Sequence, residues 1–283
     1  MKNDELIHGR RGALRLVAGL GAAAATGLVA ACQSDAQGPA APGTAPPSAA
    51  PPAAGPPAAV PRNPAAYRLQ PMTGELPPGH RTAPPVRKEP FLELPEVGRS
   101  VVLTFDDGPE PTYTPQILDI LRAHDVRAMF FVCGEMVSYF PDLVRRAADE
   151  GHLIGNHTWT HPELPKQSKA RIKDEMGRTS EIVERTTGSA PQWFRAPYGS
   201  WNAYTYQLHA ELGMEPLAWY VDTMDWSEPG TGKIVRSVLD GLGPGRVVLS
   251  HDGGGVRSQT VAALRRYLPE LPRRGYATAL PHP

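Results

Sequence analysis

The sequence is poor in cysteine and has no net charge. Cys32 and Cys133 are its two cysteines, too few for a disulfide framework in a chain of 283 residues. Lysine and arginine together number 29, as do aspartate and glutamate, so the formal net charge is zero. Binding to nucleic-acid phosphates requires a basic excess, and we therefore expect no nucleic-acid partner.

A long apolar run is also missing. Residues 16–31 read LVAGLGAAAATGLVAA, a stretch too short and too rich in alanine and glycine to span a bilayer. Basic residues precede it, an order typical of an export signal. The stretch ends in the letters LVAAC, which resemble a bacterial lipobox closing at Cys32. We predict a lipoprotein signal peptide over residues 1–32 with lipidation at Cys32, and Arg10-Arg11 resembles a twin-arginine signal.

Proline is the residue in excess, with 32 copies that gather in the first third of the chain. Residues 33–90 are rich in proline and alanine and show no hydrophobic period, so they cannot bury enough surface to offset their ordering entropy. We predict a disordered, semi-rigid spacer with a reach on the order of 100 Å. An anchored domain at residues 97–283 would then stand away from the outer face of the bacterial cell membrane.

From Ser100 onward, apolar runs alternate with helical patterns. The expected strands are Val101–Phe105, Arg127–Val132, His152–Gly155, Gln192–Arg195, Pro216–Val221, Arg246–Leu249 and Tyr276–Leu280. The expected helices are Thr114–His124, Asp142–Glu150, Lys169–Thr186, Asn202–Leu212, Thr231–Leu242 and Ser258–Tyr267. This alternation predicts an α/β fold with a mostly parallel sheet. Periodicity leaves open whether the sheet is a barrel or an open doubly wound sheet.

Polar residues follow the ends of several predicted strands. They are Asp106, Asp107, His157, His161, Arg195, Asp222, Asp225 and His251. The carboxyl ends of parallel strands share one face, where α/β enzymes carry their chemistry. The pattern therefore predicts a single composite site.

Two adjacent carboxylates, Asp106 and Asp107, close the first strand. Neighbouring side chains of a strand point to opposite faces, so both can reach one site only if the strand breaks, and Gly108-Pro109 break it. One carboxylate can then bind a metal while the other takes a proton. The alternative is ordinary Asp-Gly-Pro turn chemistry.

His157 and His161 lie four residues apart, the spacing that meets on one side of a helical turn and is used for zinc. Two histidines and one aspartate leave coordination positions open for water and substrate, which defines a catalytic site. The same ligand set serves non-haem iron oxygenases, but their all-β scaffold is not predicted here.

Two further residues complete the predicted chemistry. His251, at a strand end, suits a general acid near neutral pH. Arg195, between an apolar strand and a Pro-Tyr-Gly turn, is expected to pair with a carboxylate. Cys133 lies within an apolar run, and we interpret it as a buried core residue.

Residues from about 100 to 280 resemble the polysaccharide deacetylases with a NodB-homology domain, carbohydrate esterase family 4. The matching motifs are Thr104–Pro109, His157–Pro162, Arg195–Gly199, Asp222–Trp226 and Leu249–Asp252. The resemblance implies a distorted (β/α) barrel of the NodB-homology type that holds a divalent metal, zinc or alternatively cobalt.

The resemblance also implies roles for individual residues. Asp106 would be the base, oriented by Arg195. The metal ligands would be Asp107, His157 and His161. His251 would be the acid, with Asp225 beside it. The implied substrate-binding residues are Tyr198, Pro197, Trp226 and Leu249; among them, Trp226 and Leu249 would line the acetyl pocket. Trp159 and Trp201 are candidates for a sugar-binding surface or for the core.

The function implied is hydrolysis of acetyl groups on a polysaccharide, a reaction on linear amides that are not peptide bonds. The expected substrate is N-acetylglucosamine in peptidoglycan or a chitin-like glycan. An acetyl-xylan esterase acting on oxygen esters shares the catalytic residues, and a non-catalytic carbohydrate-binding lipoprotein shares the fold. The expected partners are an acetylated polysaccharide and, through Cys32, the membrane; we expect a monomer.

Overall fold

The computed structural model describes residues 83–281. The predicted signal peptide, Cys32 and most of the predicted spacer lie outside these residues. None of the helices between residues 83 and 281 has the length and apolar character of a membrane span.

The described part of the chain is built on a curled, parallel sheet. Its strands are β1 (Ser100–Asp106), β2 (Met129–Val132), β3 (Leu153–Asn156), β4 (Trp193–Phe194), β5 (Glu215–Pro216), β6 (Val221–Asp222), β7 (Val247–His251) and β8 (Ala277–Thr278). They run in the order β5-β4-β3-β2-β1-β7-β6, and β8 pairs with the start of β1. The predicted α/β class and the distorted barrel are confirmed.

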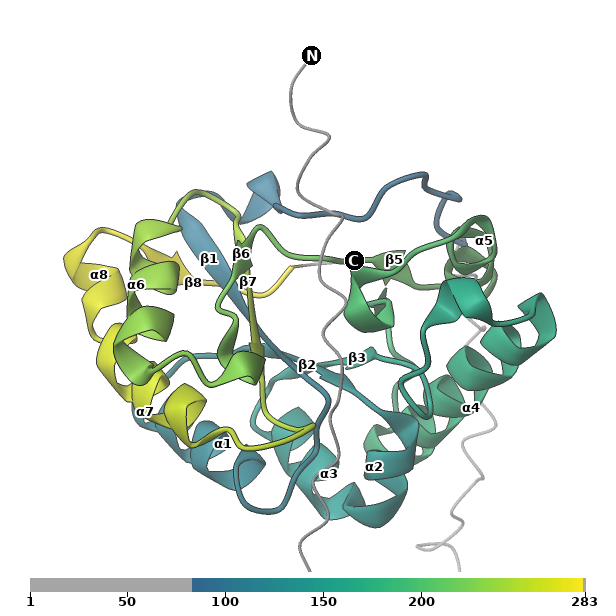
Figure 1. Cartoon of the computed structure of the whole chain (residues 1–283), viewed down its shortest axis with the longest axis horizontal. Coiled ribbons are helices and arrows are strands. Elements are labelled where there is room, and N and C mark those ends of the chain that lie inside the picture. The colour runs from purple at the N-terminus through teal and green to yellow at the C-terminus, as the bar shows by residue number, and fades with distance from the viewer. Residues whose placement is uncertain (1–82, 282–283) are drawn as a thin grey trace, which may run out of the picture. The chain divides into compact units, whose positions relative to one another are not determined.

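Helices surround the strands (Figure 1). They are α1 (Thr114–Ala123), α2 (Gly134–Tyr139), α3 (Pro141–Asp149), α4 (Lys169–Thr187), α5 (Ala203–Glu211), α6 (Thr231–Asp240), α7 (Ser258–Tyr267) and α8 (Glu270–Arg273). The short helices α2 and α8 were not predicted, because a six-residue or four-residue segment is too short to show a helical period.

The side chains of strand β1 point alternately into two apolar clusters, and this alternation decides which face carries Asp106. Val101, Leu103 and Phe105 belong to the main core, which includes the apolar faces of α1 and α7. Val102 belongs to a second cluster, with Met129 and Phe131. Since side chains of a strand alternate between faces, Asp106 shares the face of Val102, away from the main core. Burial on both faces explains why β1 appears in the sequence as a continuous apolar run.

The predicted strand Pro216–Val221 is wrong as a single element. Its first residue, Pro216, ends β5 at one edge of the sheet, beside β4, and its last residue, Val221, begins β6 at the other edge, beside β7. Residues 217–220 connect the two edges. The carbonyl groups of Leu217 and Ala218 accept hydrogen bonds from the side chain of Arg195 instead of from a neighbouring strand.

The segment before residue 97 also makes contacts with the sheet. The spacer was expected to end at residue 90 and the domain to begin at residue 97. Arg87 forms an ion pair with Glu215 at 2.6 Å, and Leu94 is buried in the cluster of Val102. Residues between Arg87 and Leu94 therefore pack against the folded part of the chain, ahead of the predicted start of the domain.

Candidate active site

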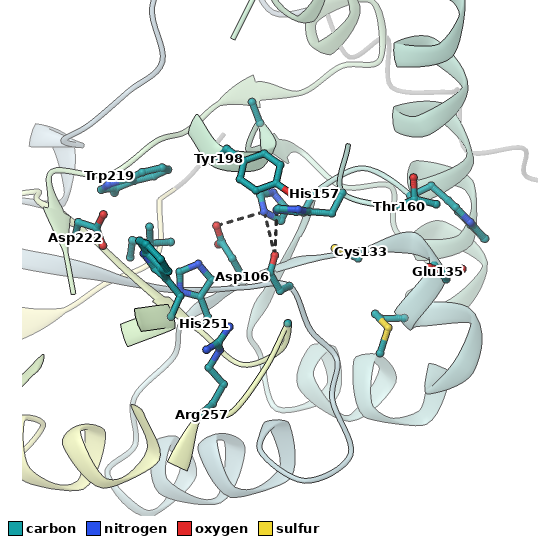
Figure 2. A pocket seen from close by; sticks show the side chains of 18 residues that line it. Asp106, Cys133, Glu135, His157, Thr160, Tyr198, Trp219, Asp222, His251 and Arg257 are labelled. Carbon is teal, nitrogen blue, oxygen red and sulfur yellow. Dashed lines mark ion pairs between the residues drawn. The ribbon is translucent and has the colours of Figure 1, made fainter. Parts of the chain in front are cut away.

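A cavity of about 650 Å³ lies at the carboxyl ends of the strands (Figure 2). Its lining includes the predicted residues Asp106, Asp107, His157, His161, Tyr198, Asp222, Trp226, Leu249 and His251. Arg195 and Asp225 are buried behind it and bond to two of these side chains. Pro197 is buried and lies outside the lining set. The structure thus gathers the predicted site from five separate strand ends.

The turn after β1 turns both carboxylates towards the cavity. The strand ends at Asp106, and Asp107 has a φ of 72°, in the left-handed region. The break therefore falls at Asp107 itself, one residue earlier than Gly108-Pro109. A Cβ atom on Gly108 would lie 2.2 Å from Oδ2 of the buried Asp252, so this close approach requires glycine.

Asp107, His157 and His161 form a group that fits a divalent cation. Each offers a ligand atom, and the three atoms lie within 4.8 Å of one another. Oδ1 of Asp107 is buried and has no hydrogen-bond partner among residues 83–281. It lies 3.5 Å from Nε2 of His157 and 3.3 Å from Nε2 of His161. An orphaned carboxylate oxygen between two imidazole nitrogens is the donor set of a catalytic metal site.

The protonation of His157 agrees with a ligand role. Its Nδ1 lies 2.8 Å from the carbonyl oxygen of Arg195, and an Nδ1–H that donates to this carbonyl leaves the Nε2 lone pair free. Burial, followed by repulsion from His161, lowers the pKa of His157 to about 3. A neutral imidazole is the form that binds a metal.

The two histidines do not lie on a helical turn, as their spacing suggested. They lie in a loop after β3, with positive φ angles at Thr158 (70°) and His161 (56°). The ring centroids are nevertheless 4.9 Å apart. The rings of His157 and His161 therefore lie side by side as predicted, but a loop and not a helical turn brings them together.

Arg195 is fully buried and binds Asp106. Its Nη1 donates to Oδ1 of Asp106 at 2.6 Å and to Oγ1 of Thr104 at 2.8 Å. Its other donors bond to carbonyls of the 217–220 connection, and its guanidinium lies 4.1 Å from the ring centroid of Phe131. Burial raises the pKa of Asp106, while the charge and hydrogen bond of Arg195 act to lower it.

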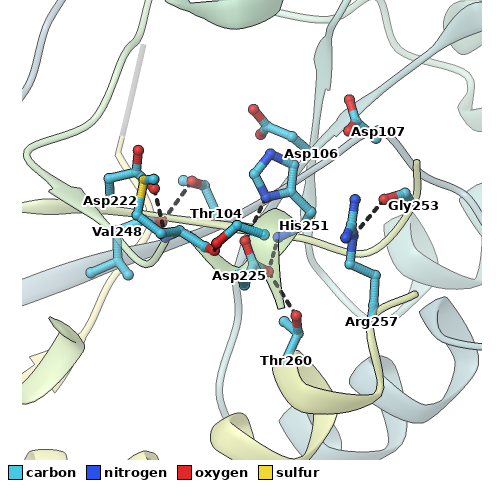
Figure 3. Close-up of polar contacts among 12 residues, drawn as sticks. Thr104, Asp106, Asp107, Asp222, Asp225, Val248, His251, Gly253, Arg257 and Thr260 are labelled. Atoms are coloured by element: carbon cyan, nitrogen blue, oxygen red, sulfur yellow. Dashed lines mark hydrogen bonds and ion pairs between the residues drawn. The ribbon is translucent and has the colours of Figure 1, made fainter. Parts of the chain in front are cut away.

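His251 is held by Asp225 from below, and Figure 3 shows its ring between Asp225 and Asp106. Oδ1 of Asp225 lies 2.7 Å from Nδ1 of His251, and Oδ2 accepts the backbone N–H of His251 and the hydroxyl of Thr260. Burial acts to lower the pKa of His251, but its hydrogen bond to Asp225 and the nearby carboxylates raise it to about 9. The imidazolium is therefore the dominant form at neutral pH.

Aromatic side chains lie at the cavity mouth, where Tyr198 is 67% and Trp226 is 53% exposed. Trp159 also lines the cavity, whereas Trp201 stacks on Tyr206 and packs against a separate apolar cluster that includes Phe194 and Leu208. Further lining residues, to which the sequence assigned no role at the site, are Cys133, Glu135, Met136, Thr160, Ala196, Trp219, Gly254 and Arg257. Of these, Cys133 was interpreted as a core residue, and it is both buried and adjacent to the cavity.

A triad with the donor set for a divalent cation, at the carboxyl face of an α/β barrel and beside a buried carboxylate and a histidine–aspartate pair, is the arrangement of a metal-dependent hydrolase. The polysaccharide deacetylase family model matches residues 94–217. A chitooligosaccharide deacetylase of Rhizobium leguminosarum bv. trifolii is 43% identical over 204 residues, which cover 68% of this chain and 94% of the relative.

Two further comparisons agree. A peptidoglycan-N-acetylglucosamine deacetylase of Bacillus cereus is 41% identical over 176 residues, which cover 62% of this chain and 64% of the relative. The family 4 carbohydrate esterase from Streptomyces lividans, solved with acetate, is 35% identical with a TM-score of 0.61, covering 65% of this chain and 93% of that one. The chain belongs to the polysaccharide deacetylase family, carbohydrate esterase family 4, and is a hydrolase that removes acetyl groups from a polysaccharide.

Proposed function

We propose that this deacetylase acts on N-acetylglucosamine units of a cell-envelope glycan, peptidoglycan or a chitin-like polymer. The observation that carries the proposal is the similarity to deacetylases of chitooligosaccharides and of peptidoglycan N-acetylglucosamine. The pairing of His251 with Asp225 agrees with it, because the pair keeps a proton donor charged at neutral pH. An amine leaving group needs such a donor, because it cannot depart as an anion. The relatives that act on peptidoglycan N-acetylglucosamine and on chitooligosaccharides support the same substrate class.

The proposed metal ligands are Asp107, His157 and His161, and the proposed ion is zinc. When bound, the ion supplies Lewis-acid polarisation of the acetyl carbonyl and lowers the pKa of a water molecule. Asp106 accepts a proton from the attacking water, and Arg195 holds this carboxylate in place. Three protein ligands would leave coordination positions open for both the water and the substrate.

The other residues act on the leaving group and the developing negative charge. We assign to the backbone N–H of Tyr198 a hydrogen bond to the oxyanion. His251 donates its proton to the sugar nitrogen as the carbon–nitrogen bond breaks, and Asp225 stabilises the imidazolium before the transfer. Acetate and a free amine are the products. Leu249 and Trp226 line the space for the acetyl methyl group.

The test is acetate release from matched N-acetylated and O-acetylated substrates. We expect release from N-acetylglucosamine oligomers, its loss after chelation, and its return when zinc is added. His157→Ala and His161→Ala should each lose both metal and activity, because each removes a nitrogen ligand. Full metal occupancy in either variant by elemental analysis would overturn the ligand assignment, and release from acetyl-xylan alone would overturn the substrate.

The pH dependence gives a second prediction. His251 carries its proton below a pKa of about 9, so we expect kcat to fall as the pH rises through this value. Asp225→Asn removes the interaction that raises this pKa, and the alkaline limb should then move to lower pH. The measurement is the pH profile of kcat for both proteins. An unmoved limb in Asp225→Asn would assign the alkaline limb to another group.

We also propose that the protein is exported and anchored by a lipid at Cys32 to the outer face of the bacterial cell membrane, with residues 33 to about 86 as its tether. The support is the lipobox-like end of the apolar stretch and the proline-rich composition that follows. A single folded domain at the end of such a tether is expected to work as a monomer.

The anchor is tested by substitution. Cys32→Ser should move the protein from washed membranes to the soluble fraction, while acetate release by the catalytic domain stays unchanged. Membrane fractionation with immunoblotting measures the shift, and mass spectrometry of the N-terminus shows whether the signal peptide was removed. A processed Cys32→Ser protein that still sediments with membranes would exclude the lipid anchor.

A further inference from the structure

The loop that carries both proposed histidine ligands has little secondary structure of its own. It follows β3 and contains two residues with positive φ, Thr158 and His161. His157 and Thr158 are buried, Trp159 is half-buried and Thr160 is exposed, and the N–H groups of the loop find their partners elsewhere in the fold. One partner is Asn156, whose Oδ1 accepts the N–H of Thr158 at 2.9 Å.

A second group of contacts of the loop converges on one carboxylate, that of Glu175 on α4. Oε2 of Glu175 accepts the N–H of Trp159 at 2.8 Å and the N–H of Thr160 at 2.7 Å. Oε1 accepts a hydrogen bond from the hydroxyl of Thr160 at 2.8 Å and forms an ion pair with Arg171 at 2.5 Å. Consecutive backbone N–H groups that converge on one oxygen form a concave anion site, so the loop is shaped around this side chain.

Burial makes these bonds important for the conformation. The Glu175 side chain is 0% exposed, and its negative charge is balanced by Arg171 and by three donors of the loop. A buried N–H that loses its acceptor costs about 1–3 kcal/mol. The N–H groups of Trp159 and Thr160 share one oxygen of Glu175 and are part-buried, so the loss of each bond lies towards the lower end of this range. The loop is therefore held by an acceptor that lies inside the fold on α4.

The anchored residues lie between the two proposed ligands in the chain. His157 follows directly from β3 and is fixed by its bond to the Arg195 carbonyl. His161 is only 24% exposed in its side chain, but its own backbone conformation is left-handed and depends on the residues before it. The bonds at Trp159 and Thr160 therefore act on the position of His161 relative to Asp107, together with the N–H groups of Gly134 and Glu135, which donate to the carbonyls of Thr158 and Trp159.

We propose that Glu175 is a positioning residue that fixes His161 against Asp107 and thereby sets the affinity of the metal site. The inference rests on the proposed ligand assignment. Glu175 acts through the loop backbone and does not touch the metal or the substrate.

Three variants of the full chain separate this role from a general effect on folding. Glu175→Asp keeps the charge but is one methylene too short to reach the loop. Glu175→Gln keeps the length, and its amide oxygen can still accept both N–H groups. Glu181→Ala, an exposed position on the same helix with no ion pair among residues 83–281, is the matched control.

Zinc affinity of the apoprotein, measured by competition with a chromophoric chelator, is the first readout. We expect Glu175→Asp to raise the zinc dissociation constant about 10–100-fold, Glu175→Gln to show a smaller loss, and Glu181→Ala none. Hydrogen exchange in the apoprotein is the second readout. The amides of residues 157–161 should exchange faster in Glu175→Asp, and those of β1 should not.

The outcomes distinguish the positioning role of Glu175 from the ligand role of His161. Unchanged zinc affinity in Glu175→Asp, combined with weakened binding in His161→Ala, would overturn the positioning role alone. A fall in the melting temperature of Glu175→Asp without a change in zinc affinity or hydrogen exchange would also overturn the positioning role. Unchanged zinc affinity in His161→Ala would instead overturn the ligand assignment on which the role rests.

Discussion

Replacing Asp106 by asparagine is expected to lower kcat by about 10²–10⁴-fold while the metal stays bound. The amide keeps the size of the carboxylate but cannot accept a proton from water. The proposed ligand Asp107 remains unchanged, as do both histidines, so metal content should not fall. The measurement is kcat together with the zinc content of the same preparation.

Asp107→Asn is the companion experiment. It removes a negative charge from the proposed coordination set, and it should weaken metal binding while leaving the base in place. Added zinc or cobalt should then restore part of the activity of Asp107→Asn and none of the activity of Asp106→Asn. Restoration of Asp106→Asn alone would show that the two roles are reversed.

The second large effect is expected at Arg195. Arg195→Met would leave Asp106, which is 2% exposed, as a buried charge without its partner. Breaking a buried pair in this way costs about 3–5 kcal/mol in the free energy of unfolding. The loss of the arginine also removes the interaction that opposes the rise in the pKa of Asp106, so the base would hold a proton at higher pH. Urea denaturation measures the first effect and the pH profile the second.

Two controls make the Arg195 result specific. Arg145→Met disrupts an exposed ion pair on α3 and should change stability by no more than about 1 kcal/mol. The double variant Arg195→Met with Asp106→Asn should recover part of the lost stability, because the unpaired charge is then gone. If the double variant is less stable than Arg195→Met, the arginine contributes mainly through its backbone acceptors and not through Asp106.

The sequence predicted the class of fold and the set of residues at the site because both depend on local patterns. A strand buried on both faces produces the apolar run before Asp106, and turn residues mark its end. Polar residues at strand ends then fall on one face of a parallel sheet, whatever the exact curvature. Boundaries of the long helices, such as α4 and α7, also agree closely with their predicted ranges.

What the sequence could not show depends on contacts between distant segments. The run Pro216–Val221 has the composition of one strand, and only the curled sheet divides it between two edges. The loop conformation of His157 and His161 depends on Glu175, which belongs to another element. The available signal was an acidic residue on the buried stripe of a helix, beside Ile172 and Met176. A charge in that position is rarely buried without a specific partner.

The connection between the two edges of the sheet limits its shape by simple length. In a flat sheet, the path from β5 to β6 would cross six interstrand spacings of about 4.8 Å, roughly 29 Å in all. Pro216 and Val221 bound these edges and are joined by residues 217–220, a path that extends at most about 18 Å. No flat arrangement can satisfy both lengths, so the sheet has to bend towards a cylinder. The width of the catalytic cavity is therefore limited by the number of residues in one short connection.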